Sequence, residues 1–157
     1  FVCTGNTCRS PMAEGALRVL LEKERPDKFE VLSCGTHAGG SYPATEYAVE
    51  VAKLWNADLS KHRSQPLSVD LIERSDLILA MTSEHLRSIT KLAQSDSEKA
   101  YLFKNFPDQS PKGEPVDDPI GQALEKYNET FLEIGEFLGR FLPEIVERID
   151  AKTDSRN

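Results

Sequence analysis

The chain has 157 residues, a formal net charge of -7 at neutral pH and 39% hydrophobic residues. This length suits one domain with its own core. The acidic balance argues against non-specific nucleic-acid binding, which depends on excess Lys and Arg, and every apolar run is shorter than the ~20 residues of a membrane span. We expect a soluble protein that binds neither nucleic acid nor membrane.

The three cysteines, Cys3, Cys8 and Cys34, are an odd number and do not have the spacing of a disulfide framework. No secretory signal is visible, so we expect a reducing cytoplasm. Phe1 and the two residues after it read as the end of a strand, and we expect a few apolar residues to precede them.

Helical and strand patterns alternate in the first third of the chain. Residues 11–24 have an amphipathic helical period with Pro11 at the first position and Ser10 as the expected N-cap. Residues 29–34 predict a short strand, and residues 44–55 return to helical spacing.

The same alternation continues through the middle of the chain. Residues 77–81 form a continuous apolar run, which is typical of a strand covered on both faces. Thr82 is placed to cap a following helix that carries Leu86 and Ile89, and residues 101–103 predict a weaker strand.

A long loop and a long helix complete the chain. Residues 104–119 are punctuated by Pro and Gly and are too long for a simple connection, which is typical of a functional loop. Apolar residues then recur every three or four positions over 124–149, predicting a helix that Pro143 can bend. We expect one domain over residues 1–150 and a frayed polar tail over 151–157.

Strands that alternate with helices predict an α/β fold with a parallel sheet, in which ligands gather at the carboxyl ends of the strands. Cys3 lies at such an end and opens the segment CTGNTCRS. A loop between a strand and a helix N-terminus points backbone N–H groups into a common hollow that favours anions. The expected cradle residues are Thr4, Gly5, Asn6, Thr7, Cys8 and Ser10.

Within this loop, Arg9 offers a planar fork suited to two phosphate oxygens. Gly5 and Asn6 allow backbone conformations that let the loop curl around an anion. A thiol at a helix N-terminus beside an arginine favours the nucleophilic thiolate form, so Cys3 is the candidate nucleophile, with the Ser10 hydroxyl beside it.

Other interpretations of the loop are weaker. Cys3 could be an inert buried residue, the usual fate of an isolated cysteine. A metal site at Cys3 and Cys8 lacks a second Cys or His pair at ligand spacing. A nucleotide-binding P-loop is excluded because the Gly-Lys-Ser/Thr ending is missing.

Four motifs resemble one known family: CTGNTCRSP, Ser33-Cys34-Gly35-Thr36, Leu79-Ala80-Met81-Thr82 and Asp118-Pro119. The chain is similar to the low-molecular-weight protein tyrosine phosphatases and their bacterial arginine-phosphatase relatives. This resemblance implies a flavodoxin-like three-layer sandwich, with a four-stranded parallel sheet flanked by helices. It also implies phosphoryl transfer through a phosphocysteine without metal or cofactor.

The resemblance also assigns roles to residues. Cys3 would attack phosphorus while Arg9 and the loop amides hold the oxygens. Asp118 would protonate the leaving group and then activate water, with Asp117 as the competing candidate.

Around this centre, Asn6, Ser33 and His62 would support the loop. Cys34 stands where relatives often have Ala, and we expect a buried thiol there. Cys8 would trap oxidised Cys3 as a disulfide.

The expected partner is a phosphorylated protein, acted on by a monomer. Thr7 offers a hydroxyl and room for a guanidinium, and Ile120 and Gly121 replace the aromatic residues that follow Asp-Pro in tyrosine-specific members, so phosphoarginine is favoured. Phosphotyrosine is the alternative, since Tyr42 can stack on a ring.

Two further classes remain open but are disfavoured. A thioredoxin-linked arsenate reductase would need resolving cysteines after the third strand, and residues 82–157 contain none. An inactive phosphoprotein-binding module would be expected to lose Cys3, Arg9 or Asp118, and all three are present.

Overall fold

A four-stranded parallel sheet forms the centre of the structure, a computed structural model that describes residues 1–93 and 96–155. The strands lie in the order β2-β1-β3-β4. They are β1 (Val2–Cys3), β2 (Cys34–Gly35), β3 (Ile78–Ala80) and β4 (Ala100–Leu102). In the register, Val2 pairs with Cys34 on one side and with Ala80 on the other. This is the flavodoxin-like strand order, and it confirms the predicted fold class.

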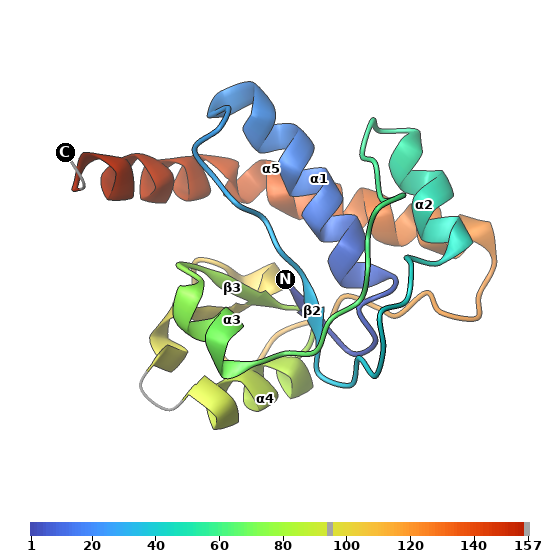
Figure 1. Cartoon of the computed structure of the whole chain (residues 1–157), viewed down its shortest axis with the longest axis horizontal. Helices are drawn as coiled ribbons and strands as arrows, with labels where there is room; N and C mark the ends of the chain where they lie inside the picture. Colours follow the sequence, from blue (N-terminus) through green and yellow to red (C-terminus); the bar gives the residue numbers. More distant parts are fainter. Residues whose placement is uncertain (94–95, 156–157) are drawn as a thin grey trace.

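Helices cover both faces of the sheet (Figure 1). On one side lie α1 (Arg9–Glu24), α2 (Glu46–Lys53) and the long α5 (Leu124–Asp154). On the other side lie α3 (Val69–Arg74) and α4 (Ser83–Ala93). Two 3-10 turns, η1 (Asp96–Lys99) and η2 (Phe103–Asn105), flank β4. The result is a three-layer sandwich.

Each face of the sheet has its own apolar cluster. The larger cluster includes Met12 of α1 with Ile134 and Leu138 of α5, all fully buried. The smaller one includes Ile72 of α3 and Ile89 of α4. The strands are buried on both faces, which explains why residues 77–81 are continuously apolar. No helix in the described residues is long and apolar enough to cross a membrane.

The first helix begins at Arg9, two residues earlier than predicted, and Ser10 is not its N-cap. Cys8 occupies the N-cap position, and its side chain makes no capping hydrogen bond. The Ser10 hydroxyl is instead held by Cys3 Sγ at 2.9 Å and by the Asn6 amide at 2.8 Å. These contacts engage the hydroxyl inside the loop, so it is not available to cap the helix.

Several other boundaries differ from the prediction. The strand expected over 29–34 is reduced to Cys34–Gly35, the part paired with β1. The six-residue α3, capped by Ser68, was not predicted. Thr82 caps α4 as expected, accepting from the His85 backbone N–H at 3.3 Å.

At the end of the chain, α5 runs through Pro143 and continues to Asp154. Residues 151–154, predicted to fray, are therefore helical, and Lys152 pairs with Asp76 beside β3. Residues 156–157 lie outside the described residues.

Candidate active site

The candidate site is the loop between β1 and α1, at the carboxyl edge of the sheet. The strand order changes direction at the β1/β3 junction, and the connections that leave these two strands diverge to opposite faces of the sheet. A crevice between diverging connections is the usual ligand site of such folds. The segment after β2 closes one side, because the His37 backbone N–H donates to the Thr4 carbonyl at 2.9 Å.

Cys3 is buried at the base of the loop, with 2% of its surface exposed. Its Sγ lies 2.9 Å from Ser10 Oγ and accepts the Asn6 backbone N–H at 3.3 Å. These two contacts place Cys3 Sγ at the centre of the polar groups of the loop. The sequence prediction of a hydroxyl beside Cys3 matches this geometry.

Asn6 gives the loop its shape. Its φ of 57° lies in the left-handed region, which Asn tolerates better than most residues. Its buried side chain donates to Ser10 Oγ at 2.8 Å and to Ser33 Oγ at 2.9 Å. Gly5 does not adopt a positive φ, and a Cβ there would meet Thr7 Oγ1 at an ordinary 3.7 Å. The left-handed turn therefore belongs to Asn6 rather than Gly5.

A polar network outside the loop holds Asn6. His62 Nε2 lies 2.7 Å from the Asn6 carbonyl oxygen, and the Gln65 backbone N–H donates to Asn6 Oδ1 at 2.9 Å. Ser33 donates to Glu14 Oε2 at 2.6 Å. Sequence reasoning named Ser33 and His62 but missed Glu14 and Gln65.

Arg9 spans the site from the first turn of α1. Nη1 donates to the Val116 carbonyl at 3.1 Å, and Nη2 donates to Asp118 Oδ2 at 2.9 Å. Arg9 Nε is buried and has no hydrogen-bond partner among the described residues. A buried N–H without a partner is costly, so this atom is a ready donor for an oxyanion in the cradle.

The structure separates the two candidate acids. Asp118 pairs with Arg9 across the mouth of the loop, and 40% of its side chain is exposed. Asp117 lies 3.7 Å from Lys126, with 69% of its side chain exposed. Of the two carboxylates, Asp118 is therefore the one that contacts Arg9, and Asp117 contacts Lys126 instead.

Cys8 and Thr7 lie on the α2 and α5 side of the loop. Cys8 Sγ lies 3.5 Å from Thr45 Oγ1 and 3.4 Å from the Tyr127 hydroxyl. Burial and the bond to Cys8 raise the pKa of Tyr127 to about 12, so this hydroxyl keeps its proton. Thr7 is half-buried, and its Oγ1 lies 3.9 Å from Cys8 Sγ.

Two further positions bear on the site. His85, on the first turn of α4, is buried, with its Nε2 2.8 Å from Thr4 Oγ1. Sequence reasoning missed it, although its place three residues after Thr82 was a visible signal. Cys34 is buried, as expected, and burial raises the pKa of its thiol.

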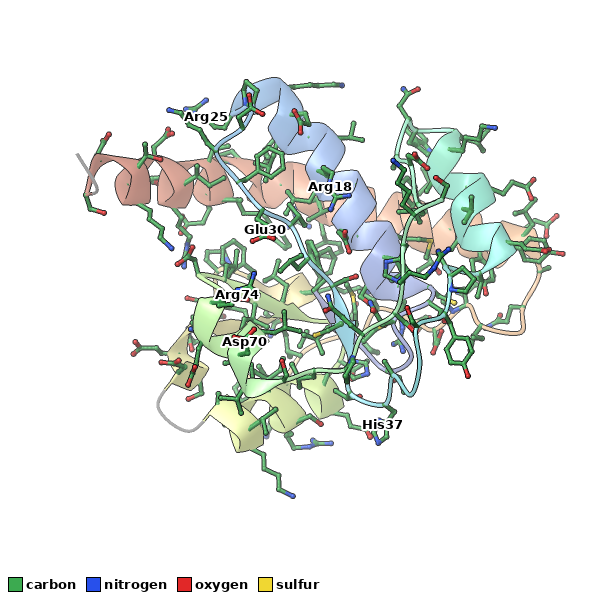
Figure 2. All side chains as sticks on the ribbon, viewed as in Figure 1. Arg18, Arg25, Glu30, His37, Asp70 and Arg74 are labelled. Carbon is green, nitrogen blue, oxygen red and sulfur yellow. The ribbon has the colours of Figure 1, made fainter. Side chains whose placement is uncertain are left out.

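Features elsewhere in the described residues do not compete with this site. No group of three or more His, Cys, Asp or Glu there could hold a metal ion. A cavity of about 710 Å³ lies near the amino ends of the strands and is lined by Phe1, Glu30 and Arg74. Figure 2 shows Glu30 and Arg74 well away from His37. His37 comes shortly after β2 and contacts the loop at Thr4, so it marks the opposite end of the sheet. Parallel sheets bind at their carboxyl ends, so the loop and not this cavity is the candidate site.

Comparison with known proteins agrees with the fold and the loop. The sequence profile described as "Low molecular weight phosphotyrosine protein phosphatase" matches residues 1–154. The chain is 38% identical over 138 residues to the protein-arginine-phosphatase of Bacillus subtilis, covering 88% of this chain and 89% of that protein.

Two solved structures are similar in fold. The low molecular weight protein tyrosine phosphatase from T. tengcongensis superposes with a TM-score of 0.84 and 36% identity, covering 92% of this chain and 96% of that one. A cysteine-to-serine mutant of the YwlE arginine phosphatase, with a phosphorylated active-site serine, gives a TM-score of 0.80 and 34% identity, covering 100% of this chain and 95% of that one.

The chain therefore belongs to the low molecular weight phosphotyrosine protein phosphatase family. It is a protein phosphatase and hence a hydrolase, as its sequence resemblance implied.

Proposed function

We propose that Cys3 is the nucleophile of a two-step phosphatase reaction. The observation that carries the proposal is the position of Cys3 Sγ, at the centre of the loop and between the Asn6 amide and the Ser10 hydroxyl. In the first step the thiolate forms a bond to phosphorus, and the bond from phosphorus to the substrate's nitrogen or oxygen breaks. Arg9 and the loop amides bind the phosphoryl oxygens.

Asp118 supplies the proton in this scheme. It leaves Arg9 when phosphate binds and protonates the departing side chain as general acid. In the second step it takes a proton from water, which attacks the phosphocysteine and releases phosphate and the Cys3 thiolate. The 2.9 Å contact with Arg9 supports this role because it holds Asp118 at the mouth of the cradle.

The substrate is proposed to be phosphoarginine in a protein. Thr7 presents a half-buried hydroxyl rather than an apolar wall, and Asp118 adds a carboxylate that can accept from a guanidinium. A relative that shares 38% identity is named an arginine phosphatase, whereas one at 36% is named a tyrosine phosphatase. Overall identity therefore does not separate the two substrates.

Phosphotyrosine is the second candidate. Tyr42, Tyr47 and Ile120 are 62%, 42% and 56% exposed. Tyr47 packs edge-on against Tyr127, which contacts Cys8 in the loop, so an aromatic side chain stands close to the cradle. Such a side chain could stack on a phenyl ring.

The experiment compares kcat/KM for a phosphoarginine and a phosphotyrosine peptide in wild type and in Thr7→Ile, corrected for spontaneous P–N hydrolysis. The substitution deletes a hydroxyl and adds an apolar wall, so phosphoarginine turnover should fall steeply. An added apolar contact helps a phenyl ring by only ~1–3 kcal/mol, so phosphotyrosine turnover should hold or improve. A wild type that prefers phosphotyrosine would favour the second candidate. A ratio that Thr7→Ile does not move would contradict the role of Thr7 on which the phosphoarginine proposal depends.

We also propose a redox response at Cys8. Peroxide would oxidise Cys3 to a sulfenic acid, and Cys8 Sγ would attack that sulfur, form a disulfide and release water. Both thiols belong to one loop and both are free, which supports this response. Dithiols would restore the enzyme.

Finally, we propose that the enzyme acts as a monomer in the cytoplasm on phosphorylated proteins, not on nucleic acid or membranes. One chain supplies Cys3, Arg9 and Asp118, so the site needs no partner copy. All three cysteines are free in the described residues, as is usual in a reducing compartment. Size-exclusion chromatography and subcellular fractionation would test these points.

A further inference from the structure

His85 links the phosphate-binding loop to the connection after β3. Its ring is buried, with 2% of the residue exposed. Nε2 lies 2.8 Å from Thr4 Oγ1, and Nδ1 lies 3.1 Å from Thr82 Oγ1. Thr4 in turn accepts a hydrogen bond from Arg9 Nη2 at 3.5 Å. Four residues from two segments of the chain, 4–9 and 82–85, thus form one series of polar contacts.

Arg9 can only donate, so the bond between Arg9 and Thr4 has one possible direction. Arg9 donates to the Thr4 oxygen, so the Thr4 hydroxyl proton is free to donate to His85 Nε2. His85 then carries its proton on Nδ1 and donates it to Thr82 Oγ1. Hydrogen bonds that run in one direction along such a chain strengthen one another. With the His85 proton on Nε2 instead, both Arg9 and His85 would donate to Thr4 Oγ1, and the chain would no longer run in one direction through Thr4.

A neutral imidazole is required for this arrangement, because a protonated ring has no acceptor to offer Thr4. Burial and the nearby Arg9 charge lower the pKa of His85 to about 4. His37 acts in the same direction, while Glu84 and Asp118 oppose it. The ring is therefore neutral at physiological pH.

The hydrogen bond from Arg9 Nη2 to Thr4 Oγ1 becomes important when Asp118 moves. In the structure Arg9 Nη2 is shared between Asp118 and Thr4. If Asp118 turns to protonate the leaving group, Thr4 is the side chain that still holds this edge of the guanidinium among the described contacts. We propose that His85 is a positioning residue: it fixes the Thr4 hydroxyl, which orients Arg9 on the phosphoryl group. This inference rests on the proposed role of Arg9.

The test compares His85→Gln with His85→Asn. The Gln amide can place an acceptor near the position of Nε2, whereas the Asn amide reaches only the position of Nδ1. His85→Asn removes the partner of the Thr4 hydroxyl, and this hydroxyl supports the charged Arg9. We therefore expect kcat/KM to fall about 10-fold or more in His85→Asn. His85→Gln should recover most of this loss, although both variants should lose similar thermal stability.

A double-mutant cycle with Thr4→Val separates positioning from general structural support. If His85 acts through Thr4, His85→Asn should cost little further activity in the Thr4→Val background. Additive losses would overturn the proposal, as would equal activity of the Gln and Asn variants. Wild-type turnover of either phosphopeptide is measured separately, so failure of the proposed phosphatase reaction is distinguishable from failure of the role of His85.

The tautomer gives an independent readout. Nitrogen chemical shifts of the His85 imidazole at pH 7 should show a proton on Nδ1 and none on Nε2. Thr4→Val should change the Nε2 shift, because the donor to it is removed. A ring protonated on Nε2, or on both nitrogens, would contradict the proposed hydrogen-bond chain.

Discussion

Replacing Asp118 with alanine should have two opposite effects, on turnover and on phosphate binding. Proton donation by a positioned group contributes typically 10²- to 10⁴-fold, so kcat on a peptide with a poor leaving group should fall by about this factor. An activated aryl phosphate needs little protonation and should lose less. The difference between the two substrates isolates the acid role.

Binding of inorganic phosphate should move the other way. Asp118 Oδ2 lies 2.9 Å from Arg9 Nη2, so a phosphate must displace the carboxylate before it takes the whole guanidinium. Because the Asp118 side chain is 40% exposed, the pair is worth about 0.2–1 kcal/mol. Removing it should tighten phosphate inhibition by up to about fivefold.

Asp117→Ala is the matched control, one residue away and directed at Lys126 instead of Arg9. It should leave kcat on both substrates and phosphate inhibition nearly unchanged. Steady-state kinetics on the three proteins, with phosphate as competitive inhibitor, measures all of these quantities. A larger loss in Asp117→Ala, or equal losses on both leaving groups in Asp118→Ala, would refute the assignment.

Two further predictions concern Cys8 and His85. Wild type treated with mild peroxide should recover with dithiothreitol and show a Cys3–Cys8 crosslink by mass spectrometry, whereas Cys8→Ser should be inactivated irreversibly; an absent crosslink would reject the redox proposal. Folding lowers the pKa of His85 from 6.5 to about 4. Between pH 6.5 and 4 the unfolded chain therefore binds a proton at this histidine that the folded chain does not, so the free energy of unfolding should fall as the pH is lowered through this range. The stability advantage of wild type over His85→Gln, from urea unfolding, should shrink across that window, and a constant difference would contradict it.

The loop was predictable because its chemistry is local. Cys3, Arg9 and Ser10 converge within one connection, so their spacing alone indicated an anion site. Asp118 lies far from Arg9 in sequence, and only the resemblance through Asp118-Pro119 singled it out.

The supporting residues were harder to predict because tertiary packing brings them to the loop. Glu14 lies on α1 one turn after Ser10 and reaches Ser33 across the fold. Gln65 contributes a backbone N–H, which no side-chain pattern reveals. His85 lies 81 residues from Thr4. Its place three residues after Thr82 hints at a local contact with the helix cap, but not at the contact with Thr4 in the loop.

Secondary-structure errors have similar causes. The segment 29–34 has strand propensity, but strand identity depends on a partner, and only Cys34–Gly35 pairs with β1. The α3 helix spans fewer than two turns, too few for a helical period to be recognised. The segment 151–154 continues α5 as helix, which composition alone does not predict.

The central claim is that Cys3 carries the phosphoryl group between the two steps. The most direct measurement is rapid quenching during turnover, followed by mass spectrometry that locates the phosphoryl group within residues 3–10. A phosphoryl group on Cys3 Sγ in wild type, with no turnover in Cys3→Ala, is the predicted result. A phosphoryl group on any other residue, or turnover in Cys3→Ala comparable to wild type, would contradict the mechanism.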